Sequence, residues 1–401
     1  MKMKQVLVIG GGASGLVAAI ACARGGASVT VLEARKKIGT KLLTTGNGRC
    51  NYTHTGEIGQ AYRGKSAGFA REVLSNFSSD DTIAFFRDLG IYPLNRDNWV
   101  YPHSEQAASV LKALSEELSR LGVKIKTNEI VTEIRRDATS PHPFTVRTKT
   151  WHYEGDAVIA CCGSPASLKE SFPNLDLLTP FRLKSRPYHP ALTYLTTSDK
   201  KAAAQWAGVR ARAGAALYTE ERRCDLIWQE TGQIQFTARG ISGIPIFNMS
   251  SLAGRELAFG HHPFVLMDLF PFGSERELLS FMNEVKSHAP KKTIQDLASG
   301  LLPDKLIPLV LPPSVTTTEA AAHAVKNFSV PVTGTGPLSA SQVAGGGIDP
   351  TSLDPSNMMV RSVPGLYVTG EMLACDAVCG GWNLQLAWST GYLAGKSAAK
   401  F

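Results

Sequence analysis

Residues 5–15 read Gln-Val-Leu-Val-Ile-Gly-Gly-Gly-Ala-Ser-Gly, an apolar run followed at once by a glycine-rich turn. The apolar run does not alternate with polar residues, which is typical of a strand buried on both faces. An Ala-rich segment, 16–25, predicts a helix, and 27–32 predicts a second strand that ends in Glu33. The turn fits the pattern G-x-G-x-x-G, so the whole stretch predicts a βαβ unit of the dinucleotide-binding type.

Each glycine of the turn, and the acid at the end of the second strand, has a chemical reason. Gly10 allows a sharp turn, Gly12 allows backbone N–H groups to approach a diphosphate, and Gly15 allows the helix to pack close to the sheet. The helix N-terminus offers unpaired donors and a positive dipole end, and Glu33 can accept hydrogen bonds from a ribose. An ordinary strand–helix turn is the alternative. We expect these residues to bind a cofactor: Gly10, Gly12, Ala13, Ser14, Gly15, Glu33 and Ala34.

A second glycine-rich loop follows at 35–51. It carries Lys36, Lys37, Lys41 and Arg49, and it ends in the run Thr-Thr-Gly-Asn-Gly-Arg-Cys-Asn at 44–51. Gly46 and Gly48 free backbone N–H groups for an anion-binding nest, and Asn47 tolerates a positive φ between them. The loop indicates a ligand longer than a nicotinamide domain needs, laid across the sheet toward a reactive ring. A flexible surface loop with solvated lysines is the alternative.

Together, the unit from Gly10 to Glu33, Gly39-x-Lys41 and the run from Gly46 to Asn51 resemble the BaiN/YhiN-like flavoprotein family of aminoacetone oxidase-type FAD-binding enzymes. The family pattern is G-G-G-R-C-N, and Asn47 takes the place of its middle glycine. The resemblance covers nearly the whole chain and implies that FAD is the cofactor. It implies these residues of the second loop as further contacts: Lys41, Leu42, Gly46, Gly48, Arg49 and Asn51.

The middle of the chain alternates helices and strands. Segments 71–89 and 105–121 predict helices, and 123–134, 144–150, 151–153 and 156–160 predict strands. The resemblance implies that Val131 lies against the adenine and that Gly163 lies where a sheet edge approaches the cofactor. The chain reads Ala-Cys-Cys-Gly at 160–163 where the family has A-T-G-G, and a positive φ costs Cys162 more than it costs the glycine of the family. Packing residues or a redox pair are the alternatives for the two cysteines.

In the C-terminal segment, a last predicted strand ends in Gly370-Glu371. A glycine turn and a final helix follow it. The resemblance places Gly370 and Glu371 at the ribityl-phosphate region. It directs the final helix, which begins with Gly381, Asn383 and Leu384, at the pyrimidine end of the flavin, where its positive end stabilises the reduced anionic ring. The family pattern G-E-x-L-D-x-D-G-x-x-G-G-Y-N is altered at Ala374, Ala377 and Trp382. Any substrate contact of the first Asp is therefore lost. Cys375 and Cys379 are either buried thiols or a dithiol.

We therefore expect an α/β protein, a Rossmann-like FAD-binding domain with an inserted β-barrel-like domain and a small helical insertion. The expected FAD-binding domain is 1–186 together with 330–401. The insert, 187–329, has a helical subdomain at about 253–313 and forms a lid over the flavin. His189 and Arg239 border its strands and could face the ligand, although we favour a structural role.

The expected function is an FAD-dependent oxidoreductase that transfers a hydride between flavin and a small organic substrate of unsaturated-acid or amine type. Oxidase and NADH- or NADPH-dependent reductase both remain open, with a slight preference for the reductase. A flavin-binding redox sensor or partner protein without turnover is the alternative. No residue stands out as the catalytic acid or base, and no metal site is expected.

The composition indicates the class of protein, its compartment and its partners. The 401 residues are 43% hydrophobic and 19% charged, which is ordinary for a globular protein of two or three domains. No apolar stretch reaches the roughly 18 residues of a membrane span. Because the first predicted strand begins at residue 5, we expect no signal peptide. Seven cysteines without a C-x-x-C pair indicate reduced thiols and a cytoplasmic protein. The chain has a net charge of +8, but its basic residues do not form the cluster that is typical of nucleic-acid-binding proteins. We expect a monomer or weak homo-oligomer.

Overall fold

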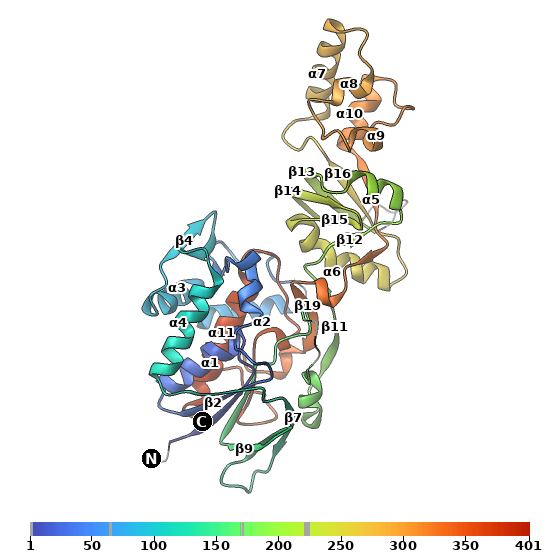
Figure 1. Cartoon of the computed structure of the whole chain (residues 1–401). Helices are drawn as coiled ribbons and strands as arrows, with labels where there is room; N and C mark the ends of the chain where they lie inside the picture. The colour runs from blue at the N-terminus through green and yellow to red at the C-terminus, as the bar shows by residue number, and fades with distance from the viewer. Residues whose placement is uncertain (1–2, 64–65, 169, 171, 220–224) are drawn as a thin grey trace. The chain divides into compact units, whose positions relative to one another are not determined.

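The computed structural model describes residues 3–63, 66–168, 170, 172–219 and 225–401. They form two compact units, which we describe one at a time (Figure 1). Unit 1 comprises Met1–His189 and Gln342–Phe401, and unit 2 comprises Pro190–Ser341. Each unit has its own cluster of buried apolar side chains. The functional division of the chain into an FAD-binding domain and a substrate-covering insert remains a prediction.

A five-stranded parallel sheet forms the centre of unit 1, in the order β20-β10-β1-β2-β6. Its strands are β1 (Gln5–Ile9), β2 (Ser28–Glu33), β6 (Lys124–Thr127), β10 (Ala157–Ala160) and β20 (Leu366–Val368). Ile9 is in register with Leu32 on one side and with Ala160 on the other, so these strands end at one edge. Open parallel sheets bind ligands at this edge. The expected Rossmann-like fold is confirmed.

Two helices from opposite ends of the chain pack against each other beside this sheet (Figure 1). They are α1 (Ala13–Arg24) and α11 (Trp382–Ala398). A Cβ at Gly391 would lie 2.3 Å from the backbone oxygen of Ser14, so only glycine permits this approach. A Cβ at Gly395 would likewise lie 2.2 Å from the backbone oxygen of Ala18. Gly391 and Gly395 therefore allow α11 to pack closely against α1, the helix that follows the glycine-rich turn.

Further elements surround this centre. The helices are α2 (Ser66–Asn76), α3 (Ser79–Asp88) and α4 (Ala107–Arg120), with short 3₁₀ segments η1 (Leu42–Gly48), η2 (Leu175–Phe181), η4 (Pro350–Ser352) and η5 (Gly370–Met372). Two antiparallel sheets comprise β3 (Thr53–His54), β4 (Pro93–Arg96) and β5 (Trp99–Pro102), and β7 (Val131–Arg136), β8 (Phe144–Thr148) and β9 (His152–Gly155). A two-stranded sheet pairs β11 (Ser185–Ala191) with β19 (Val343–Ile348).

The single helix expected over 71–89 was wrong, because the structure has two helices there, α2 and α3. The break falls at Ser78, which is the N-cap of α3. Its hydroxyl accepts a hydrogen bond from the Asp81 backbone N–H, and the Asp81 carboxylate accepts one from the Ser78 backbone N–H. This reciprocal capping box stabilises the start of a new helix at Ser78.

Unit 2 contains a seven-stranded sheet in the order β17-β16-β13-β14-β15-β12-β18. Its strands are β12 (Leu195–Thr196), β13 (Arg210–Tyr218), β14 (Leu226–Thr237), β15 (Gly240–Ser242), β16 (Phe264–Asp268), β17 (Phe328–Pro331) and β18 (Gly334–Thr335). Among the described residues, pairing runs only between neighbours in this order, so β17 and β18 are edges. The expected barrel-like closure is therefore not seen.

The helices of unit 2 form two groups. The first comprises α5 (Lys200–Trp206) and α6 (Ile244–Ala258), with η3 (Leu338–Ala340) near the end of the unit. The second comprises α7 (Glu275–His288), α8 (Ile294–Ala298), α9 (Ile307–Val310) and α10 (Thr318–Lys326). This second group lies between β16 and β17 in the chain, which pair with each other. In the described ranges, no helix is both long enough and apolar enough to span a membrane.

Candidate functional site

The turn between β1 and α1 presents free backbone donors at the sheet edge. Gly10 has a φ of 104°, and a Cβ there would lie 2.4 Å from the backbone oxygen of Cys161. Gly12 is the N-cap of α1, has no side-chain cap, and has open space where a Cβ would be. A Cβ at Gly15 would lie 2.0 Å from the Gly10 backbone oxygen. The first N–H groups of α1, from Ala13 and Ser14 onward, therefore face an open cradle of a shape that suits a phosphate.

Glu33 ends β2 in a fixed orientation at this edge. Its Oε2 accepts a hydrogen bond from the Gly11 backbone N–H at 2.7 Å, and its Oε1 accepts one from the Arg35 backbone N–H at 2.8 Å. Each carboxylate oxygen keeps a further lone pair. The two N–H donors therefore hold an anionic acceptor ready for the hydroxyl groups of a sugar.

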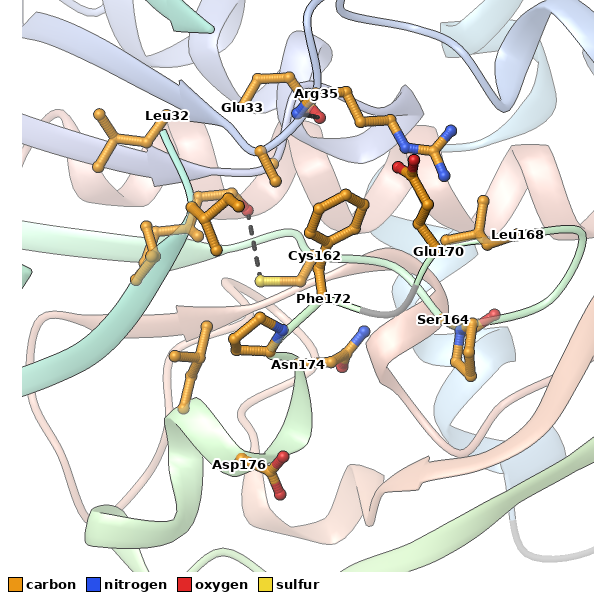
Figure 2. Close-up of a pocket in the computed structure, with 18 of the residues that line it drawn as sticks. Leu32, Glu33, Arg35, Cys162, Ser164, Leu168, Glu170, Phe172, Asn174 and Asp176 are labelled. Carbon is orange, nitrogen blue, oxygen red and sulfur yellow. Dashed lines mark hydrogen bonds between the residues drawn. The ribbon is translucent and has the colours of Figure 1, made fainter. Parts of the chain in front are cut away.

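A cavity of about 310 Å³ opens beside Glu33 (Figure 2). Four of the expected cofactor contacts line it, namely Gly10, Glu33, Ala34 and Val131. Its volume lies at the lower end of the range for small-molecule sites, which suits one nucleoside-sized group. This is where the adenosine part of a dinucleotide is expected.

Residues from the segment that follows Gly163 also line this cavity, which was not predicted from the sequence. Phe172 lies with its ring centroid 5.7 Å from the guanidinium carbon of Arg35. Figure 2 shows Phe172 and Glu170 on the side of the cavity where Arg35 lies. Asn174 donates from Nδ2 to the backbone oxygen of Gly163. Nothing in the spacing of residues 164–177 could have revealed this, because the segment lacks any periodic pattern.

Tyr188, also missed, ties this covering segment to the rest of unit 1. Its hydroxyl donates to the Gly163 backbone oxygen at 3.3 Å and lies 3.1 Å from Asn174 Oδ1. Burial raises the pKa of Tyr188, and the charge of Glu371 acts in the same direction. Gly163 itself has a φ of 68°, and there is open space where its Cβ would be. Cys162 keeps a negative φ, so the positive φ falls on the glycine.

The second glycine-rich loop forms η1 and the residues that follow it. Positive φ values occur at Gly46 (55°), Asn47 (55°), Gly48 (85°) and Cys50 (58°). The expectation that Asn47 tolerates a positive φ is confirmed. Such a run of positive φ values is typical of loops in which backbone N–H groups are aimed at an anionic ligand.

Side chains of this loop have different surroundings. The Lys41 ammonium forms an ion pair with Glu371, whose Oε1 also accepts a hydrogen bond from the Ala344 backbone N–H at 3.0 Å. Arg49 instead lies over the ring of Tyr101, with its guanidinium carbon 5.9 Å from the centroid. Leu42 is buried. Any cofactor contact of Leu42 must therefore involve its backbone.

Asn51 carries the clearest mark of a missing partner. Its side chain is 8% exposed, and neither Nδ2 nor Oδ1 has a hydrogen-bond partner among the described residues. A Cβ at Gly381, the N-cap of α11, would lie 2.8 Å from Asn51 Oδ1. Buried amides are rarely left unpaired in the interior of a protein. A ring edge that combines a carbonyl with an N–H, such as the pyrimidine edge of a flavin, would satisfy both atoms.

Asn383, expected as a cofactor contact, has its amide occupied by the chain itself. Its Oδ1 accepts a hydrogen bond from the Ala377 backbone N–H at 2.9 Å, and its Nδ2 donates to the Ala377 backbone oxygen at 3.0 Å. The side chain therefore holds the segment before α11. Leu384 is partly buried against the core. Contacts of both residues through backbone N–H groups of the first turn remain predictions.

The two halves of the site meet at Ser14. A Cβ at Gly370 would lie 2.6 Å from Ser14 Oγ, and the Gly370 backbone N–H donates to Thr390 Oγ1 at 3.0 Å. Residues of α1, η5 and α11 are therefore in contact at one point. The two helices that begin after Gly12 and after Gly381 therefore pack against each other and against η5.

The cysteines near the site are free thiols. Burial raises the pKa of Cys161 and of Cys375 to about 12, so both thiols stay protonated at neutral pH. Cys375 donates to the backbone oxygen of Ser66. In the described ranges, no group of three His, Cys, Asp or Glu side chains is placed to hold a metal ion.

Comparisons with known proteins agree with this geometry. A family model described as "HI0933-like protein Rossmann domain" matches residues 4–397. The chain is 37% identical to the 3-dehydro-bile acid delta(4,6)-reductase of Clostridium scindens, over 99% of this chain and all of the relative. It is 27% identical to the ribosomal RNA dihydrouridine synthase of Haemophilus influenzae, over 98% of each chain.

Among solved structures, the 3-ketosteroid delta1-dehydrogenase of Sterolibacterium denitrificans, in complex with 1,4-androstadiene-3,17-dione, aligns over all of both chains. Its TM-score is 0.50 and its sequence identity 10%, so the likeness concerns the fold alone.

Proposed function

The chain belongs to the HI0933-like family of Rossmann-domain flavoproteins, and from this premise we propose that it reduces a carbon–carbon double bond conjugated to a carbonyl group. It is an FAD-dependent oxidoreductase that acts on a small organic substrate. When bound, the flavin supplies hydride transfer. The alternative of a flavin-binding protein without turnover gains no support, since the two relatives are both named as enzymes.

The common chemistry of the relatives supports this reaction. In a 3-oxo steroid with double bonds at positions 4 and 6, both bonds are conjugated to the ketone. Dihydrouridine differs from uridine by two hydrogens across a bond conjugated to a ring carbonyl. Both names therefore describe the addition of two hydrogens across a bond conjugated to a carbonyl. Where that bond joins the α- and β-carbons, the flavin would supply a hydride to the β-carbon, and a proton would be added to the α-carbon. The family resemblance had also allowed an amine oxidase, which neither relative is.

The unpaired amide of Asn51 at the N-terminus of α11 is the observation on which the cofactor assignment depends. A helix N-terminus next to the flavin pyrimidine favours negative charge there, and so favours the reduced ring. We propose that the α1 turn holds the diphosphate and Glu33 the ribose. The adenine would occupy the cavity next to Val131, and Asn51 with the first turn of α11 would hold the pyrimidine.

A steroid-like unsaturated acid is the substrate class that we favour. The relative with the higher identity acts on a bile acid. In unit 2, Lys and Arg barely outnumber Asp and Glu, so most of the net charge of +8 lies in unit 1, where the anionic cofactor would bind. RNA is the second candidate, because a relative named for ribosomal RNA aligns over almost the whole chain.

Anaerobic reoxidation of the reduced protein tests this proposal. The protein is first reduced with dithionite, or with NADH or NADPH, and then mixed with a 3-oxo-Δ4,6 steroid acid. Return of the oxidised flavin absorption band is the expected result. The fully saturated 3-oxo acid is the matched control, because it has the same ring skeleton and polar groups but no conjugated double bond. A uridine-containing ribosomal RNA fragment tests the second candidate. Failure of the conjugated acid to reoxidise the flavin, with reoxidation by an amine-derived imine instead, would contradict the proposal.

A further inference from the structure

Asp376 lies in the segment between η5 and α11, and the chain holds this segment on both sides of it. Before it, the Cys375 thiol donates to the Ser66 backbone oxygen. After it, the backbone of Ala377 both donates to and accepts from the Asn383 amide, and Ala377 pairs with Tyr62 in an isolated β-bridge. A carboxyl group between two such anchors is presented by a rigid support, as chemistry on a substrate requires.

The Asp376 carboxylate has no hydrogen bond from another residue in the part of the chain that the structure describes, although it is only partly exposed. The charged groups that face it are His189 from β11, Arg63 from before α2, and Glu371 from η5. The Cys375 thiol adjoins it. Burial raises the pKa of Asp376, and Glu371 acts in the same direction, whereas His189 and Arg63 act against them.

The neighbours of Asp376 are themselves fixed in place. The imidazole of His189 packs on Gly345, where a Cβ would lie 2.3 Å from His189 Nε2. Glu371 is held by Lys41 and by the Ala344 backbone N–H. Three segments distant in the sequence, at 63, 189 and 371, therefore place charged groups around one carboxyl group to which no other residue in the described ranges donates a hydrogen bond. Functional sites often gather charged groups around one carboxyl group in this way.

We propose that Asp376 is the acid that gives a proton to the α-carbon of the substrate during reduction of the conjugated bond. This inference rests on the function proposed above. The β-carbon receives a hydride from the reduced cofactor, and the π electrons of the double bond move toward the carbonyl. They then form the new C–H bond at the α-carbon with the proton of the Asp376 carboxyl. Asp376 remains as a carboxylate and takes up a proton from water before the next turnover.

The other candidates nearby are less suited to this step. Both oxygens of Glu371 already accept hydrogen bonds, from Lys41 and from Ala344. The Tyr188 hydroxyl is engaged with Gly163. Burial lowers the pKa of His54, so its imidazole is neutral at pH 7 and has no readily released proton. Asp376 is the carboxyl group of this cluster whose oxygens have no donor from another residue, within the described ranges.

The test compares Asp376→Asn and Asp376→Glu with the parent holoprotein. Binding of the saturated 3-oxo steroid acid is measured first, from the change in the flavin spectrum, and both variants are expected to bind within about threefold of the parent. Reoxidation of the reduced protein by the 3-oxo-Δ4,6 acid is measured next. We expect Asp376→Asn to be slower by roughly 10²–10⁴-fold, the range for loss of a general acid. Asp376→Glu should recover part of the rate.

The dependence of the reoxidation rate on pH distinguishes proton donation by Asp376 from a purely structural role of its side chain. The protonated carboxyl is the active form, so the parent rate should fall as pH rises through the pKa of Asp376, and this fall should be absent in Asp376→Asn. Asp88→Asn, an exposed aspartate on α3, is the matched control and should leave the rate and profile unchanged.

An active parent with an equally active Asp376→Asn variant would overturn the inference alone. Loss of ligand binding together with the rate, with the pH profile kept, would also overturn it, since Asp376 would then only support the site. A parent that does not reduce the conjugated acid at all would overturn the proposed function and this inference together.

Discussion

The imidazole of His54 stacks on the indole of Trp382, with ring centroids 4.5 Å apart and an angle of 22° between the planes. His54 belongs to β3, and Trp382 is the first residue of α11. The Trp382 backbone oxygen also accepts a hydrogen bond from the Tyr62 hydroxyl at 2.7 Å. The aromatic stack therefore fixes the start of the helix whose N-terminus forms one end of the cofactor site.

Removal of this stack should destabilise unit 1. Trp382 is 4% exposed, so Trp382→Ala should lower the free energy of unfolding by about 3–5 kcal/mol through loss of buried area and a residual cavity. Trp382→Tyr, which restores the residue usual in the family pattern, should cost much less because an aromatic ring still meets His54. Urea denaturation monitored by far-ultraviolet circular dichroism, a signal that does not depend on tryptophan fluorescence, measures both changes.

Trp151 provides the control for this comparison. It is 64% exposed and stacks on His152 within the β8–β9 hairpin. Trp151→Ala should change the free energy of unfolding by no more than about 0.5 kcal/mol. Equal losses for the two alanine variants would show that the stack at α11 contributes nothing specific.

Asn51 should show opposite effects on stability and on cofactor affinity. An unpaired buried amide costs about 1–3 kcal/mol, so Asn51→Leu should stabilise the protein without flavin by about 1 kcal/mol. The same change removes a donor and an acceptor, so the affinity for FAD should fall by roughly tenfold. Denaturation of the flavin-free protein and quenching of flavin fluorescence give the two values.

Asn95 is exposed on β4, and Asn95→Leu should leave FAD affinity unchanged. If Asn51→Leu destabilised the flavin-free protein and kept full affinity for FAD, the amide would have a structural partner and the assignment of the pyrimidine edge would be wrong.

The sequence predicted those parts of the fold and site that depend on local patterns. The apolar run of β1, the turn at Gly10 and the acid at Glu33 follow one another in the chain, so their spacing sufficed. The positive φ of Asn47 followed from the side chain alone. The break at Ser78 was also readable, since Ser78 and Asp81 have the spacing of a capping box, but the continuous apolar pattern concealed it.

Other parts depend on tertiary contacts that no local pattern reveals. Phe172 and Asn174 cover the cavity only because their irregular segment folds back over the sheet edge. Asn383 sits in a motif that suggests cofactor binding, yet its amide holds Ala377. The surroundings of Asp376 comprise charges from distant segments, so the sequence alone gave no reason to distinguish it as an acid.

Glu33 should distinguish FAD from FMN. Glu33→Gln removes the negative charge and leaves one of two N–H donors, at Gly11 or Arg35, facing an amide NH₂ group. We expect the affinity for FAD to fall by roughly 10- to 100-fold, in the range for loss of a charge-assisted hydrogen bond, which is about 1.5–3 kcal/mol. FMN carries the flavin ring without the adenosine, so its affinity should not change. Fluorescence titration measures both.

Glu129 lines the same cavity, but its carboxylate accepts hydrogen bonds from Thr150 Oγ1 at 3.1 Å. Glu129→Gln is therefore the matched control, with an expected effect of less than about threefold, or roughly 0.6 kcal/mol. A similar loss of FAD and FMN affinity in Glu33→Gln would mean that the residue supports the fold rather than the ribose.

Glu117 links α4 to α1 and should make the stability of unit 1 depend on acid. Its carboxylate forms ion pairs with Arg120 at 2.6 Å and with Arg24 at 2.8 Å, and its side chain is 8% exposed. The hydrogen bond from Arg120, followed by the interactions with Arg24, lowers the pKa of Glu117 to about 2 despite the opposing effect of burial. A carboxyl group with a lowered pKa stabilises the folded state only where it is ionised.

Because the pKa in the unfolded chain is about 4.5, this stabilisation should be complete above that pH and should be lost as pH falls toward about 2. Glu117→Gln should therefore reduce the free energy of unfolding at pH 7 by roughly 2 kcal/mol and should flatten its decline between pH 5 and 2, a range set by the two pKa values. Glu116 has an exposed side chain that pairs with Lys112 at 3.7 Å, so Glu116→Gln should change neither. Urea denaturation at a series of pH values measures the effect. Parallel acid profiles for the parent and Glu117→Gln would show that the carboxylate keeps an ordinary pKa in the folded protein.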